Sequence, residues 1–98
     1  MKINKIANGQ DLTIGLEGRL DTTTAPSLDD ELKGALGGVT NLEFDLSKLE
    51  YISSAGLRVL LSAQKVMNKQ GSMVVKNVSD EVKEIFEVTG FVDILTIE

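Results

Sequence analysis

The side chains of this chain that are able to do chemistry are carboxylates, hydroxyls, Tyr and Lys, because the sequence contains no Cys and no His. The absence of Cys excludes disulfides, thiol nucleophiles and thiolate metal ligands. The absence of His removes the usual metal ligand and the usual general base, and so excludes a hydrolase of the Ser-His-Asp type. We expect a protein that is not an enzyme and that has no metal site and no cofactor.

Two hydroxyl groups stand together in the run Ser53-Ser54-Ala55-Gly56, between an expected strand and an expected helix. A Ser at such a junction commonly caps the helix by accepting a hydrogen bond from a free backbone N–H. On spacing alone this structural role is favoured for Ser53 or Ser54, and Gly56 then allows backbones to approach closely. The alternative is that one of the two hydroxyls is exposed and carries a function.

Acidic and hydroxyl side chains also occur in the run Asp21-Thr22-Thr23-Thr24, which follows an alternating apolar strand. Asp21 has two interpretations that the sequence leaves open. It begins a turn and accepts hydrogen bonds from the amides that follow, as Asp commonly does, or it contacts a partner protein.

Hydrophobic periodicity predicts the order ββαβαβα with a possible final strand, because alternation indicates strands and a spacing of three or four indicates helices. In the first helix Pro26 suits the first turn, and Asp29, Asp30 and Glu31 suit the positive end of the helix dipole. In the second helix Arg58, Ser62, Lys65 and Lys69 mark the solvent face. The expected elements are a β-hairpin over residues 1–20 that turns at Asn8-Gly9, a helix from the Thr24 N-cap to Gly37-Gly38, a strand over 42–46 with an apolar continuation to 52, a helix over 54–70 that Gly71 ends, a strand over 73–75, a helix from the Ser79 N-cap to Thr89-Gly90, and a possible edge strand over 91–97.

Strands that alternate with helices predict a parallel or mixed sheet in an α/β domain. If the second and third strands are parallel, residues 21–24 and 53–56 both leave the carboxyl ends of strands and both enter helices. On open α/β sheets this edge is where ligands and partners usually bind. We therefore expect the two hydroxyl-rich runs to form one binding surface.

The overall composition sets further limits on function. The chain has 98 residues, which suits a single domain over residues 1–98. Its 15 acidic against 10 basic residues give a net charge of −5, which argues against a nucleic-acid partner. No apolar run approaches the length of a membrane span and the N-terminus has no apolar signal core, so we expect no membrane insertion and a cytoplasmic location.

The run Asp45-Leu46-Ser47-Lys48-Leu49-Glu50-Tyr51-Ile52-Ser53-Ser54-Ala55-Gly56-Leu57 resembles the signature of STAS domains, in particular the small anti-sigma factor antagonists. The upstream run Gly18-Arg19-Leu20-Asp21 is similar to the G-x-[L/I/F]-D of that family. Gly71 before a Val-rich strand and the late run Val88-Thr89-Gly90-Phe91 resemble its C-terminal half. The resemblance covers nearly the whole chain. It implies a STAS-like α/β domain with a mixed sheet, an N-terminal β-hairpin and about three to four helices.

The resemblance also implies a function. Members of this family bind an anti-sigma factor, often a Ser/Thr kinase, and so free a sigma factor for transcription. The kinase phosphorylates the Ser before [S/A/T]-G-L, which is Ser54 here. The phosphorylated form dissociates from its partner, and a PP2C-type phosphatase restores the unphosphorylated form. This sequence has Ser53 where the family usually has Asp, so Ser53 is a possible competing acceptor. The implied partner-binding residues are Asp21, Thr22, Thr23, Thr24, Ser53, Ser54, Ala55, Gly56, Leu57 and Arg58.

Two other functions stay open at this point. STAS domains also occur as regulatory or nucleotide-binding subunits of transport or signalling complexes. A receptor-like module for a small apolar ligand is a third interpretation, although a chain of this length has little room for a pocket beyond its own core. We expect a monomer or a weak dimer. Arg58, one turn after Ser54, is expected to be solvated, with pairing to a phosphate on Ser54 as the alternative.

Overall fold

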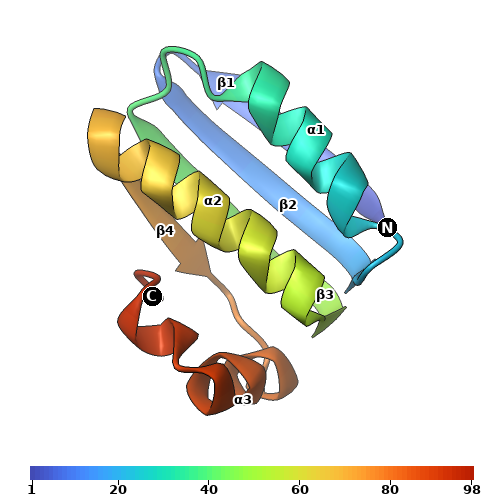
Figure 1. Ribbon diagram of the computed structural model, residues 1–98. Coiled ribbons are helices and arrows are strands. Elements are labelled where there is room, and N and C mark those ends of the chain that lie inside the picture. The colour runs from blue at the N-terminus through green and yellow to red at the C-terminus, as the bar shows by residue number, and fades with distance from the viewer.

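The computed structural model describes residues 1–98 as a single α/β domain (Figure 1). Its elements confirm the predicted order, apart from the last strand. They are β1 (Lys2–Asn8), β2 (Asp11–Leu20), α1 (Ala25–Ala35), β3 (Asn41–Ile52), α2 (Ser54–Gln70), β4 (Ser72–Lys76), α3 (Asp80–Thr89) and the short 3₁₀-helix η1 (Phe91–Asp93).

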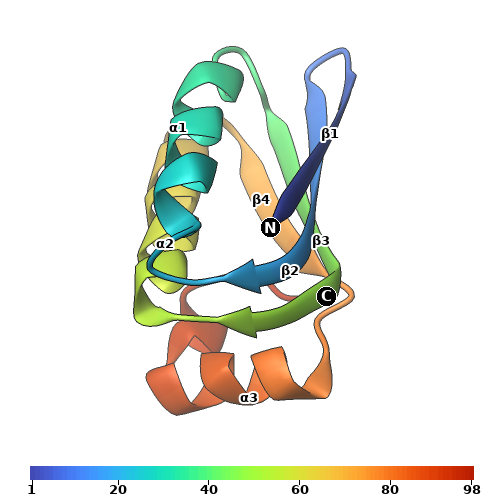
Figure 2. The same cartoon turned by 90° about the vertical axis from the view of Figure 1, so that its right-hand side faces the viewer.

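The four strands form one mixed sheet in the order β1-β2-β3-β4. β1 and β2 pair antiparallel as the predicted hairpin, whereas β2 with β3 and β3 with β4 are parallel. Helices α1 and α2 lie against one face of this sheet, the opposite face is bare, and α3 lies at one end (Figure 2). None of the helices combines the length and the apolar composition needed to cross a membrane.

The hairpin turn differs in detail from the prediction. Asn8 is the last residue of β1 and pairs with Asp11, so the two turn residues are Gly9 and Gln10. Only Gly9 has a positive φ, of 65°, and Gly at the first central position is typical of a type II′ turn. The Asn8-Gly9 pair therefore marks the turn correctly, although Asn8 itself does not adopt the left-handed conformation.

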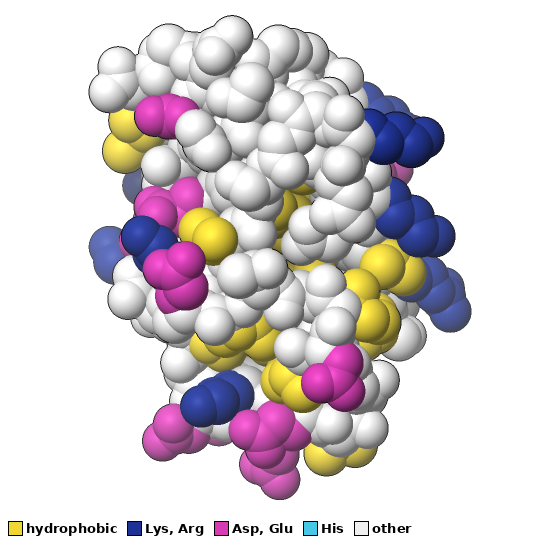
Figure 3. Space-filling view, turned by 90° about the vertical axis from the view of Figure 1, so that its left-hand side faces the viewer, with side chains coloured by type: hydrophobic (Ala, Val, Ile, Leu, Met, Phe, Trp, Pro, Cys, Tyr) yellow, Lys and Arg dark blue, Asp and Glu magenta, His cyan; other side chains and the backbone are white.

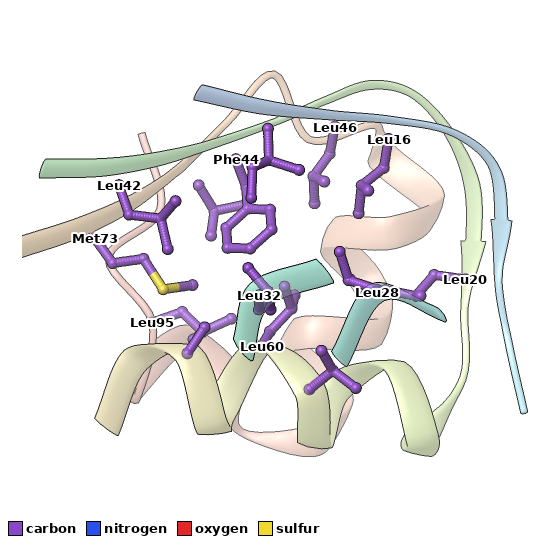
Figure 4. Close-up of a cluster of buried hydrophobic side chains, with 14 of the residues drawn as sticks. Leu16, Leu20, Leu28, Leu32, Leu42, Phe44, Leu46, Leu60, Met73 and Leu95 are labelled. Atoms are coloured by element: carbon purple, nitrogen blue, oxygen red, sulfur yellow. The ribbon is translucent and has the colours of Figure 1, made fainter. Parts of the chain in front are cut away.

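The core lies between the sheet and the helices and contains 24 buried apolar residues. Alternate residues of the central strands point into it, so that Leu42, Phe44 and Leu46 of β3 face Leu28 and Leu32 of α1 and Leu60 of α2 (Figure 4). At roughly 25 cal/mol per Å² of apolar surface, burial of this alternating set is the main force that fixes the register of the strands.

Strands β2 and β3 are both irregular near their carboxyl ends. The register between them shifts between Gly15 and Glu17 and again between Gly18 and Arg19, and such bulges bend a strand and increase its twist. Beyond the shifts the two strands curve together toward the helix side of the sheet (Figure 2). The apolar continuation predicted after residue 46 is therefore part of β3, and its curvature carries the chain directly to the start of α2.

The first helix begins where predicted, but its capping differs. Thr24 occupies the N-cap position without a side-chain bond to the helix, because its hydroxyl accepts from Asp21 N–H at 2.8 Å and donates to Arg19 O at 2.8 Å. Pro26 lies in the first turn as expected. The acidic residues 29–31 do not, because the helix starts at Ala25 and its first turn holds no acidic residue.

The possible edge strand over residues 91–97 is wrong. Residues 91–93 form η1, and the backbone N–H groups of Ile94 and Leu95 both bond to Phe91 O, which turns the chain back on itself. Phe91 packs against the core, so its burial favours the turn over an extended strand. Only one bridge remains of the expected strand, between Val75 of β4 and Ile97.

Candidate functional site

The carboxyl ends of β2 and β3 meet at one edge of the sheet, as the parallel arrangement predicts. Leu20 pairs with Ile52, and the N–H of Ser53 donates to Leu20 O at 2.8 Å. The two segments that follow, residues 21–24 and 53–58, are therefore neighbours, although 28 residues lie between them in the sequence. We call these two segments the rim.

The two serines of the rim have different environments. Ser53 is the N-cap of α2, and its Oγ accepts a hydrogen bond from Gly56 N–H at 3.3 Å. Ser54 is the first residue of the helix, and its side chain is exposed and makes no hydrogen bond within the chain. The structural role that spacing favours belongs to Ser53, and the exposed hydroxyl belongs to Ser54.

Gly56 holds the start of α2 against the sheet. A Cβ atom at this position would lie 2.7 Å from Leu20 Cγ and 2.9 Å from Ile52 Cγ1, and both of these side chains are fully buried. The predicted packing role of this glycine is therefore confirmed. Because the helix can approach β2 and β3 only without a side chain here, Gly56 sets the position of Ser54 relative to Asp21.

Asp21 organises the other half of the rim. Its Oδ1 accepts hydrogen bonds from Thr23 Oγ1 at 2.7 Å, Thr23 N–H at 2.9 Å and Thr24 N–H at 3.2 Å. These donors, with the Thr23 hydroxyl first, lower the pKa of the Asp21 carboxyl below its usual value, so the group is ionised at neutral pH. The capping interpretation of Asp21 is confirmed, and its half-exposed carboxylate also places a negative charge on the rim.

The remaining predicted site residues differ in burial, and Ala55 is half-buried and packs against the core. Thr22, Thr23 and Arg58 are exposed, and Arg58 forms no ion pair within the chain. Gly56 and Leu57 are buried, so they position the surface and do not line it.

Sequence reasoning did not single out Arg19 as a site residue. Its guanidinium carbon lies 4.4 Å from the centre of the Tyr51 ring, in a cation–π contact between register-paired residues of β2 and β3. Tyr51 is half-buried. Both residues directly precede the last residue of their strand, so this contact ties the two halves of the rim together. The sequence signal that could have indicated Arg19 is the run Gly18-Arg19-Leu20-Asp21, which contains it.

The rim is not a pocket. The five main hollows of the surface have volumes from about 150 to about 640 Å³, and none of them is lined by residues 21–24 or 53–58. No group of three or more acidic side chains is arranged to hold a metal ion. A surface of this shape suits contact with another protein better than enclosure of a small ligand.

Comparison with known proteins identifies the family. The family model described as "Mlab, STAS domain" matches residues 3–96. This chain belongs to the STAS domain family. The Bordetella bronchiseptica protein named "Putative anti-sigma factor antagonist BtrV" is 38% identical over 84 residues, which cover 84% of this chain and 72% of that protein. The anti-sigma-B factor antagonist of Bacillus subtilis is 31% identical over 91 residues, 92% of this chain and 84% of that protein.

The STAS fold is also clear from solved structures. The anti-sigma factor antagonist SpoIIAA in its unphosphorylated form matches with a TM-score of 0.77 and 17% identity, over 99% of this chain and 87% of that one. SpoIIAA of Bacillus in its phosphorylated form matches with a TM-score of 0.76 and 18% identity, over 99% of this chain and 91% of that one. Both forms of SpoIIAA therefore share this fold.

Proposed function

We propose that this STAS protein is an anti-sigma factor antagonist. It binds an anti-sigma factor of the Ser/Thr kinase type through the rim, in the cytoplasm, and thereby regulates transcription that depends on a sigma factor. Support comes from the Bacillus subtilis relative, which is named an anti-sigma-B factor antagonist and aligns over 92% of this chain. It also comes from the shape of the rim, which is exposed and not hollowed. The protein itself then needs no catalytic step.

The observation that carries the proposal is the exposed, unbonded hydroxyl of Ser54 at the first position of α2. A kinase must reach the acceptor oxygen, and any hydrogen bond that this oxygen makes within the protein must first be broken. The Ser54 hydroxyl has no hydrogen bond to break, whereas the Ser53 hydroxyl would lose its hydrogen bond from Gly56 N–H. Ser54 is therefore the phosphoacceptor, and Ser53 replaces the usual Asp as the helix cap.

Phosphorylation at Ser54 should leave the fold intact. A phosphate adds about −1.5 to −2 charge and three acceptor oxygens, and the positive end of a helix dipole stabilises such a group. The first N–H groups of α2 have no partner within the helix, and that of Ala55 is free to donate a hydrogen bond to a phosphate oxygen. The modified residue therefore fits its own helix.

The partner is affected instead. In the complex the Ser54 hydroxyl is covered, and a dianion at the same place must be desolvated against a surface that fitted a neutral group. The ionised Asp21 carboxylate lies on the same rim, so the local charge becomes more negative still. Each 1.4 kcal/mol of lost binding free energy weakens binding about tenfold. Phosphorylation thus releases the partner, and a PP2C-type phosphatase makes the cycle reversible.

The test compares the affinities of the wild type, Ser54→Asp and Ser62→Asp for the anti-sigma factor kinase by titration calorimetry. Ser62 lies on the exposed face of the same helix, two turns further along, and provides a control with the same change of charge. We expect Ser54→Asp to weaken binding by about tenfold or more and Ser62→Asp to have little effect. Equal affinities for all three proteins would contradict the proposal. An increase in the melting temperature of the isolated protein with ATP would favour a nucleotide-binding subunit instead.

A further inference from the structure

The helices α2 and α3 carry opposite charges. Helix α2 contains Arg58, Lys65 and Lys69 and no acidic residue, which gives a charge of +3. The segment 80–93, which spans α3 and η1, contains five carboxylates against Lys83 alone, which gives a charge of −4. Helix α2 and the segment 80–93 thus form one basic and one acidic surface.

These charges have no partners within the chain. The three ion pairs of the protein join Lys5 with Glu31, Lys33 with Asp29 and Lys76 with Glu43. None of the charged residues of α2 or of the segment 80–93 takes part in one. The two charged surfaces are therefore free to interact with another molecule.

Apolar side chains accompany the two charged surfaces. Val66, directly after Lys65, is 41% exposed, Val88 of α3 is 80% exposed, and Ile94 after η1 is 46% exposed. Figure 3 shows hydrophobic side chains between a basic edge that follows α2 and an acidic region over α3. Contiguous exposed apolar surface with polar residues around it is typical of protein interaction sites.

We infer that this surface binds a second copy of the same chain. A two-fold axis that lies in the contact plane, between α2 and α3, brings α2 of one copy against α3 of the other, twice. Each contact pairs lysines with glutamates across an apolar centre. A two-fold interface requires one patch that is complementary to itself, and this patch meets the requirement because both signs of charge lie on it.

The dimer is expected to be weak. A stable interface buries roughly 800 Å² on each partner, which would be a large share of the 5404 Å² that this chain exposes. Only a few apolar side chains are available at the centre, so charge attraction provides much of the specificity. Attraction between exposed charges is screened by salt, so added salt should weaken the dimer.

The test is sedimentation equilibrium of the full chain and of two charge-reversed variants, over micromolar to millimolar concentrations. The first variant is Lys65→Glu with Lys69→Glu, and the second is Glu84→Lys with Glu87→Lys. We expect the wild type to dimerise reversibly and each variant alone to associate about tenfold or more weakly. The first variant makes α2 acidic and the second removes the net charge of the segment 80–93, so the attraction across both contacts is lost. A mixture of the two variants restores both contacts, so we expect a mixed dimer, which native mass spectrometry identifies by its mass.

The control is Lys2→Glu with Lys5→Glu, which changes the net charge as much as the first variant but lies on β1, at the edge of the sheet away from α2 and α3. It should dimerise like the wild type. A monomeric wild type throughout the concentration range, or a mixture that does not form the mixed dimer, would overturn the inference. The inference does not depend on the proposed function, because none of the substituted residues belongs to the rim.

Discussion

Ser53 and Gly56 share the hydrogen bond that begins helix α2, with Ser53 Oγ accepting from Gly56 N–H at 3.3 Å. This bond distinguishes two adjacent residues of identical type. It occupies the hydroxyl of Ser53 in a structural role and leaves the hydroxyl of Ser54 without a partner, at the first position of the same helix. The stability of the helix start and the reactivity of the site are thus assigned to different residues.

Alanine variants of the two serines should therefore have different effects, one on stability and the other on phosphorylation. Ser53→Ala removes the cap and is expected to lower the free energy of unfolding by about 0.5–2 kcal/mol. It should still be phosphorylated on Ser54. Ser54→Ala loses no hydrogen bond, so its stability should stay within roughly 0.5 kcal/mol of the wild type, but it should accept no phosphate. Urea denaturation measures the stabilities, and mass spectrometry after incubation with ATP and the anti-sigma factor kinase locates the phosphate.

Phosphate found on Ser53 of the wild type would contradict this assignment. So would equal losses of stability in the two variants, because the cap would then not belong to Ser53.

Gly56 should not tolerate even a methyl group. Gly56→Ala would gain helix propensity, but its Cβ would lie 2.7 Å from the buried Leu20 side chain, and overpacking of this kind typically costs about 1–3 kcal/mol. We expect a net loss of stability and weaker binding of the partner, because α2 must move away from β2. Gly34→Ala is the matched control, since a Cβ in this position of α1 meets nothing within 4 Å. It should stabilise the protein by roughly 0.5–1 kcal/mol in the same denaturation experiment. Similar effects of the two substitutions would contradict the packing role.

Gly71 is required for a different reason than the sequence suggests. It follows the last residue of α2 with φ of 171°, an extended conformation, so it does not end the helix by a left-handed turn. A Cβ at Gly71 would lie only 1.9 Å from the carbonyl oxygen of Thr40, which is backbone and accepts the N–H of Ser72. We expect Gly71→Ala to destabilise the protein by about 3 kcal/mol or more, measured by urea denaturation. Gly37→Ala, whose Cβ meets nothing, should be nearly neutral, and a Gly71→Ala protein as stable as this control would contradict the close approach.

Much of the fold could be predicted from local sequence patterns that indicate only one type of secondary structure. Helix α2 occupies residues 54–70 as predicted, because Arg58, Ser62, Lys65 and Lys69 define an uninterrupted polar stripe along it. The neighbourhood of the two rim segments also follows from the sequence, since parallel strands present their carboxyl ends at the same edge. These features depend on periodicity and topology, which the sequence carries directly.

The features that sequence reasoning missed depend on contacts between distant residues. Residues 91–97 contain an apolar run that suits a strand or a turn equally well, and packing of Phe91 against the core decides for the turn. A different case is the cap of α2, which spacing left open between Ser53 and Ser54. The local backbone decides it, because Ser53 is extended and Ser54 is already helical. The Arg19–Tyr51 contact depends on register shifts between β2 and β3 that no local pattern encodes.

Asp45, the first residue of the signature run, has a structural role that its position in β3 explains. Its Oδ1 accepts hydrogen bonds from Ser47 N–H at 3.0 Å and from Asn77 Nδ2 at 3.1 Å. Asn77 is the only residue other than glycine with a positive φ, and it lies in the loop between β4 and α3. Asp45 thus joins the irregular end of β3 to the loop that leads into α3.

This role predicts a dependence of stability on pH. The bond from Ser47 N–H, followed by that from Asn77, lowers the pKa of the Asp45 carboxyl below its ordinary value of 3.8. A group whose pKa is lower in the folded state contributes stability above its unfolded pKa, and the contribution disappears as the pH falls through the folded pKa. The Asp45 contribution should therefore be complete at neutral pH and be lost below about pH 4. Asp45→Asn keeps an acceptor oxygen but cannot titrate, so it should be less stable than the wild type at neutral pH and lose less stability on acidification.

Urea denaturation at a series of pH values tests the Asp45 prediction. The control is Asp93→Asn, which replaces an exposed carboxylate that accepts no hydrogen bond from another side chain or backbone group. Because the hydrogen bonds to Asp45 favour the ionised form, the two substitutions should differ: the Asp93→Asn protein should follow the wild-type curve, and the Asp45→Asn curve should approach it only at acidic pH. Parallel curves for Asp45→Asn and the wild type down to the most acidic point would show that the carboxylate of Asp45, as a charge, does not hold the loop before α3 against β3.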